Sequence, residues 1–196
     1  MRPDQTNILQ WINPNDRVLD LGCGDGSLLL QLKEQKNVYG LGIEIDQPEI
    51  TECVRKGVNV IEQNLDHGLS NFKDNSFDTV IMSLALQAVR QPDQVLSEML
   101  RIGKQVVVTF PNFGYWRCRL ALAGKGTMPV SDFLPYTWYN TPNIHFCTIR
   151  DFEQLCKDNS YQILDHAVVD HDNQSSWWMR LYPNLLSEIA IYRLTR

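Results

Sequence analysis

The sequence lacks the long apolar run that a membrane-spanning helix requires. No stretch approaches the roughly 20 apolar residues of such a helix, and the opening residues, MRPDQTNILQW, contain no apolar segment of the secretory type. An excess of basic residues is also absent, because the formal net charge is −5. Nucleic acids and anionic membranes favour basic surfaces, so we expect neither as the main partner. These absences predict a cytoplasmic protein.

Cysteine is scarce and scattered. No C-x-x-C pair occurs, which argues against a zinc site or a disulfide framework and predicts reduced thiols and no metal. Internal repeats and low-complexity segments are absent too. With 196 residues, of which 43% are hydrophobic, the sequence predicts a single domain over residues 1–196. The cysteines are Cys23, Cys53, Cys118, Cys147 and Cys156.

The most informative stretch is Val18–Leu29, VLDLGCGDGSLL. A short apolar run, a glycine-rich turn and leucines at helical spacing predict a strand, a tight turn and a helix N-terminus that binds an anionic group. A dinucleotide fingerprint would be G-x-G-x-x-G, but here Gly26 comes one residue early. Starting at Asp20, the pattern D-x-G-x-G-x-G resembles motif I of the class I S-adenosylmethionine-dependent methyltransferases. That resemblance implies a loop that holds the methionine end of the cofactor.

A second signal is an acidic residue at the end of the next predicted strand, 38–44. Glu44 follows Gly22 by about 20 residues, the offset at which a carboxylate binds a ribose. A carboxylate can accept hydrogen bonds from both ribose hydroxyls. Asp46 competes for this role, but Pro48 follows it in a helix-start pattern. We therefore interpret Asp46 as a helix cap and Glu44 as the ribose ligand.

A third signal, Asn64-Leu65-Asp66, follows the third predicted strand. Ligands of parallel sheets gather at this edge, beyond the carboxyl ends of the strands. Asp66 can accept a hydrogen bond from an adenine amino group, as the matching acid does in the methyltransferases. A solvated loop aspartate is the alternative for this residue taken alone.

The remaining chain alternates between predicted strands and helices. Alternation predicts an α/β fold with a Rossmann-like, doubly wound sheet and right-handed crossovers. The last two strands are joined by 170–187 without a crossover helix, so they must pair antiparallel. Seven strands with an antiparallel C-terminal strand match the class I methyltransferase type. The expected strands are 18–21, 38–44, 58–61, 77–83, 105–110, 161–169 and 188–194, and the expected helices are 4–11 (capped by Asp4), 27–36, 46–57, 92–102 and 148–157.

An aromatic-rich insertion occupies about 113–146, between the fifth strand and a helix whose capping box is Thr148 and Asp151. Its rings can close over a small acceptor as a lid, or present an apolar surface to another protein. Packing against the domain's own core is the alternative for any single ring. The stretch contains Tyr115, Trp116, Phe133, Tyr136, Trp138, Tyr139 and His145.

Beyond motif I, the chain resembles the MetW family of methionine biosynthesis proteins. The similarity covers RVLDLGCGDGSLL, GIEID and LDHGLSNFKDNSFDTVIMSLALQAV, and is most distinctive over 110–156. It implies a protein that binds S-adenosylmethionine or S-adenosylhomocysteine and works with a homoserine O-acyltransferase (MetX-like). The cofactor contacts predicted in this way are Asp20, Gly22, Cys23, Gly24, Glu44, Ile45, Asn64, Leu65, Asp66 and Ser83.

No catalytic residue follows from the sequence. His67, His145 and His171 could each act as a base, but a lone histidine is more often a surface or core residue. Cys118 has arginines on both sides that could lower its pKa, although an unreactive thiol is the simpler interpretation. Three functions stay open: an accessory protein of the acyltransferase, an S-adenosylmethionine-dependent small-molecule methyltransferase, and a nicotinamide-dependent oxidoreductase. The glycine spacing and the terminal strand pair disfavour the last.

Overall fold

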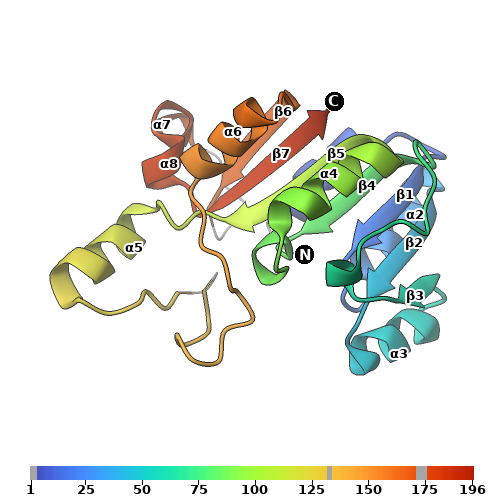
Figure 1. Ribbon diagram of the computed structural model, residues 1–196, viewed down its shortest axis with the longest axis horizontal. Coiled ribbons are helices and arrows are strands. Elements are labelled where there is room, and N and C mark those ends of the chain that lie inside the picture. The colour runs from blue at the N-terminus through green and yellow to red at the C-terminus, as the bar shows by residue number, and fades with distance from the viewer. Residues whose placement is uncertain (1–3, 132–133, 171–175) are drawn as a thin grey trace.

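A single mixed β-sheet crosses the molecule (Figure 1). The computed structural model describes residues 4–131, 134–170 and 176–196. The sheet has seven strands in the order β3-β2-β1-β4-β5-β7-β6. The strands are β1 (Arg17–Leu21), β2 (Tyr39–Glu44), β3 (Val60–Glu62), β4 (Phe77–Ser83), β5 (Gly103–Pro111), β6 (Gln162–Val169) and β7 (Ile189–Thr195).

Helices cover both faces of the sheet. The buried side chains of α4 and α6 pack on one face, and those of α1, α2 and α3 pack on the other. Among the described residues, no helix is both long and apolar enough to cross a membrane. The helices are α1 (Gln5–Trp11), α2 (Ser27–Lys36), α3 (Gln47–Arg55), α4 (Pro92–Ile102), α5 (Trp116–Leu120), α6 (Ile149–Asp158), α7 (Trp177–Leu181) and α8 (Pro183–Leu186), with the short turns η1 (Leu65–His67), η2 (Leu86–Ala88) and η3 (Ala121–Lys125).

The predicted class I methyltransferase sheet is confirmed. β1 to β5 are mutually parallel, as strands joined by crossover connections are. β7 lies between β5 and β6 and pairs antiparallel with both. The connection from β6 to β7 contains two short helices, α7 and α8, where the sequence predicted only a loop. Because neither helix crosses the sheet to start a parallel strand, the antiparallel pairing stands.

Residues close in the sequence determine where several helices begin or end. Pro92 opens α4, where its missing N–H costs no helical bond. Gly57 follows α3 with φ of 68°, a conformation that glycine adopts without steric cost. Thr148 and Asp151 exchange the two bonds of a capping box at α6.

Two predicted helix caps differ in the structure. Asp4 and Asp46 occupy the N-cap positions of α1 and α3, but neither side chain makes a capping bond. Asp4 is fully buried, and its Oδ2 accepts hydrogen bonds from the hydroxyls of Ser83 and, at 2.9 Å, Thr109. The Asp46 side chain is exposed to solvent, and its backbone N–H bonds to Glu44. For Asp4, hydrogen bonds to two distant hydroxyls thus replace the predicted cap.

The insertion after β5 projects away from the sheet as an arm (Figure 1). We use "the arm" for residues 113–146, which contain α5 and η3. Its two ends are tied together, because Phe113 N donates to Cys147 O at 3.1 Å and the rings of Phe113 and Phe146 lie 4.7 Å apart. The sheet thus carries the arm at the carboxyl end of β5, the edge where ligands of such sheets bind.

Candidate cofactor site

The glycine loop after β1 contains two glycines whose backbone conformation or surroundings disfavour a side chain. Gly24 and Gly26 have φ of 53° and 73°, in the left-handed region. A Cβ on Gly26 would lie 2.9 Å from Cys53 Sγ, so this position is closed by packing. A Cβ on Gly24 would meet nothing nearer than Glu49 Oε2 at 3.9 Å. Gly24 therefore faces open space, where its backbone can approach a ligand.

Glu44 sits beside this loop at the end of β2, as the predicted site requires. Its Oε2 accepts a hydrogen bond from Gly24 N at 2.8 Å. Its Oε1 accepts from Ile45 N at 2.7 Å and Asp46 N at 3.1 Å. These bonds fix the orientation of the carboxylate and join β2 to the loop. A carboxylate has about four acceptor positions, so Glu44 retains capacity for a ligand hydroxyl.

Two cavities meet at Gly22, which lines both. The first has a volume of about 290 Å³, and its wall contains most of the residues predicted to contact the ribose and the adenine. Its wall also contains residues for which the sequence predicted no ligand contact. The second, of about 530 Å³, lies against the loop and the start of α2. Volumes of roughly 300–1,000 Å³ are typical of small-molecule sites. The first cavity is lined by Glu44, Ile45, Asn64, Leu65, Asp66, Leu84, Ala85, Pro142 and Asn143 among others, and the second by Gln5, Cys23, Gly24, Asp25, Ser27, Gln31 and Glu49 among others.

The Asn64-Leu65-Asp66 turn is held in place from within the chain. Asn64 Oδ1 accepts from Asp66 N at 2.9 Å and so caps η1. Asp66 Oδ1 accepts from Arg90 N at 2.8 Å, and its Oδ2 lies 3.6 Å from Arg90 Nε. These contacts orient the Asp66 carboxylate at the wall of the first cavity.

Asp20 and Ser83 are placed differently from the other predicted contacts. Both are almost fully buried, at 2% and 4% exposed, and neither lines the two cavities. The Ser83 hydroxyl donates to Asp4 and lies 3.3 Å from the Thr109 hydroxyl. The structure thus places these side chains beneath the site.

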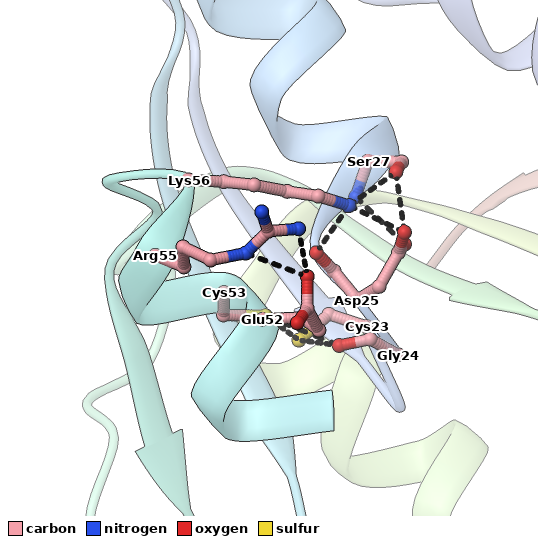
Figure 2. Close-up of polar contacts among 8 residues, drawn as sticks. All are labelled: Cys23, Gly24, Asp25, Ser27, Glu52, Cys53, Arg55 and Lys56. Atoms are coloured by element: carbon pink, nitrogen blue, oxygen red, sulfur yellow. Dashed lines mark hydrogen bonds and ion pairs between the residues drawn. The ribbon is translucent and has the colours of Figure 1, made fainter. Parts of the chain in front are cut away.

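An ion pair at the start of α2 was not indicated by the sequence (Figure 2). Lys56, just after α3, donates to the Asp25 carboxylate, to Asp25 O at 3.0 Å and to Ser27 Oγ at 2.8 Å. The hydrogen bond from Lys56 is the main reason that the pKa of Asp25 falls from 3.8 to about 2. The pair ties α3 to the wall of the second cavity.

Two buried thiols lie below the loop (Figure 2). Cys23 Sγ and Cys53 Sγ are 3.9 Å apart, and Cys53 Sγ donates to Gly24 O at 3.1 Å. Burial raises the pKa of both thiols. Burial also raises the pKa of Cys118, which agrees with the simpler interpretation of an unreactive thiol and not with a pKa lowered by its arginine neighbours. Both arginines are exposed, whereas the thiol points into the protein.

Two of the three candidate bases, His67 and His145, do not reach the site. His67 and His145 line neither cavity. His171 and Phe133 lie outside the described residues.

Leu84, which the sequence did not single out, lines the first cavity in a constrained conformation. Its φ is 55°, which is uncommon for a side chain of this size. Its N–H donates to Thr109 O at 3.0 Å and lies 3.1 Å from Thr109 Oγ1, which holds the backbone there. Such local strain is frequent at ligand sites.

Comparison with known proteins shows the family of this chain. Residues 2–194 match the family described as methionine biosynthesis protein MetW. The chain belongs to the MetW family. The resemblance predicted from the motifs is thereby confirmed.

The chain is also similar to individual relatives, one of which carries the MetW name. The chain is 33% identical to a bifunctional methionine biosynthesis protein MetXA/MetW of Rhodopirellula baltica over 98% of its own length, and covers 32% of that protein. It is also 33% identical to a demethylmenaquinone methyltransferase of Renibacterium salmoninarum over 53% of its length, and covers 46% of that protein. The chain thus spans about a third to a half of the length of these relatives.

A solved structure shares the fold. A putative S-adenosylmethionine-dependent methyltransferase of Listeria monocytogenes superposes with a TM-score of 0.71 at 16% identity, covering 99% of this chain and 96% of the other. At that identity the likeness concerns the fold, which is the class I methyltransferase fold.

Proposed function

We propose that this MetW-family chain binds S-adenosylmethionine or S-adenosylhomocysteine across the two cavities. The observation that carries the proposal is the Glu44 carboxylate, fixed in the wall of the first cavity and bonded to the Gly24 backbone that borders the second. Glu44 would accept from a ribose hydroxyl, and Asp66 from the adenine amino group. The loop and the N-terminus of α2 would hold the methionine carboxylate. Asp20 and Ser83 would act indirectly, by supporting the loop and the end of β4.

We further propose that the chain works with a homoserine O-acyltransferase in methionine biosynthesis. The relative from Rhodopirellula baltica supports this, since its name joins MetXA and MetW in one polypeptide. The arm supports it as well, because it exposes aromatic side chains, including Trp138 at 75% and Tyr139 at 72%. Exposed aromatic clusters mark protein interfaces.

Calorimetric titration tests the ligand. S-adenosylmethionine and S-adenosylhomocysteine should each give saturable heat, and NAD should give none, because the loop spacing does not fit a pyrophosphate. Heat with NAD alone would overturn the assignment.

Co-expression tests the partner. The tagged chain should retain the homoserine O-acyltransferase of the same organism at a defined stoichiometry, and acyltransferase turnover should change on complex formation. In parallel, release of S-adenosylhomocysteine from S-adenosylmethionine with candidate acceptors measures methyl transfer directly, which needs little beyond in-line positioning. Turnover without any association would establish the alternative, a small-molecule methyltransferase.

A further inference from the structure

The returning end of the arm forms part of the cofactor cavity. Pro142 and Asn143 line the first cavity together with Glu44 and Asp66. The exposed rings of Trp138 and Tyr139 lie only a few residues earlier in the chain. One short segment therefore borders both the candidate ligand site and the candidate partner surface.

This segment is fastened to the body by a few specific contacts. The backbone N–H groups of Ile144 and His145 both donate to Gln87 O, at 2.9 and 3.0 Å. The His145 ring adds a contact, with Nε2 3.2 Å from Arg90 O. Pro142, Ile144 and His145 are otherwise exposed.

Arg90 extends this set of contacts to the cavity. Its backbone N–H and guanidinium face the Asp66 carboxylate, the group placed for the adenine. A continuous chain of contacts thus runs from Asp66 through Arg90 to His145 and into the arm. It joins the ligand cavity to the aromatic surface without passing through the sheet.

We propose that ligand occupancy of the cavity and partner binding on the arm are energetically coupled through residues 142–145. The proposal rests on the function proposed above and adds regulation to it. The chain then acts as a sensor, which makes the acyltransferase complex depend on the supply of the sulfonium cofactor or its thioether product. That cofactor contains the methionine skeleton, so the coupling connects the acyltransferase complex to a compound derived from methionine.

We expect the coupling to be positive, because the ligand and the protein partner each restrict the motion of the same segment. A ligand that packs on Pro142 and Asn143 restricts a segment held by few contacts, and a protein on Trp138 and Tyr139 restricts the same segment. Whichever binds first bears the entropic cost of ordering, so the second binds more tightly. By linkage the effect is reciprocal: the partner raises ligand affinity by the same factor.

The affinity of the full chain for the acyltransferase, measured with and without saturating S-adenosylhomocysteine, tests the coupling. We expect ligand to tighten the complex about five-fold or more. In His145→Ala the ratio should fall toward one, because the anchor to Arg90 is lost. His166→Ala is the matched control, since His166 is an exposed histidine on β6, at the opposite edge of the sheet from β3. A wild-type ratio of one with both partners bound would overturn the coupling and leave the proposed function intact. An unchanged ratio in His145→Ala would overturn the route through the His145 ring and Arg90.

Hydrogen exchange on the chain alone separates the two proposals. Without any acyltransferase, S-adenosylhomocysteine should slow exchange of the Ile144 and His145 amides and of the amides of the preceding residues 137–141 and 143. If the ligand protects these amides but the acyltransferase does not bind, the proposed partner is wrong, and the proposal that the ligand orders the arm is supported. If the ligand binds and 137–146 gains no protection, the coupling is wrong.

Discussion

At the scale of single residues, the Glu44 carboxylate has two tasks. It organises the glycine loop through Gly24 N, and it is placed to accept from a ligand hydroxyl. Both tasks depend on its negative charge, because hydrogen bonds to an ionised acceptor are stronger than neutral ones.

Glu44→Gln should therefore weaken binding of S-adenosylmethionine. We expect a loss of about 1.5–3 kcal/mol, the range for hydrogen bonds to charged groups. Calorimetry measures it, and Asp46→Asn is the control, since Asp46 is exposed and lines neither cavity. Equal effects in both variants would show that Glu44 is not the ribose ligand.

Lys56→Met should return the pKa of Asp25 from about 2 toward its ordinary value of 3.8. The depressed pKa means that the ion pair contributes stability above pH 3.8 and loses it as the pH falls through about 2. Because Asp25 is 48% exposed, solvent screening keeps that contribution small. Carboxyl NMR titration gives the direct measurement. An Asp25 titration unchanged by the substitution would refute the assigned cause.

At the scale of elements, one asparagine fixes the base of the arm. Asn112 is 2% exposed and follows β5. Its Nδ2 donates to Asn184 O at 3.2 Å and Ser187 O at 2.9 Å. Its Oδ1 accepts from Gly114 N at 3.0 Å and Ile149 N at 3.3 Å. The side chain thus joins β5, the arm, α6 and α8.

Asn112→Ala should lower the free energy of unfolding by roughly 2–4 kcal/mol, because it leaves buried backbone groups without partners. Asn159→Ala is the comparison: that exposed side chain donates a single bond, to Leu155 O, whose loss costs about 1 kcal/mol or less. Urea denaturation of both variants provides the numbers. If the two variants lose similar amounts of unfolding free energy, the Asn112 hydrogen bonds do not stabilise the base of the arm as proposed.

At the scale of the whole molecule, the arm lies apart from the sheet (Figure 1) and exposes the rings of Trp138 and Tyr139. Trp138→Ser with Tyr139→Ser should weaken association with the acyltransferase at least ten-fold, as large aromatic side chains often dominate interfaces. The unfolding free energy should change little, since both rings are exposed. Tyr39→Ser is the control, because Tyr39 is 67% exposed at the amino end of β2, the sheet edge opposite the ligand site. Association that survives the double substitution would exclude this part of the arm.

The sequence by itself determined the features that depend on neighbours along the chain. Strand alternation, the glycine turn, Pro92 at the start of α4 and the Thr148 capping box are local patterns, so they could be predicted. The position of Glu44 followed as well, because parallel strands bring their carboxyl ends to one edge.

Only the tertiary structure decided which distant residues share the site. Asp4 accepts a hydrogen bond from Thr109, 105 residues away, in place of capping its own helix. Pro142 and Asn143 reach the cavity because the arm folds back onto Gln87. No short-range pattern encodes such contacts: they depend on packing and on pairing buried polar groups, which are properties of the folded chain.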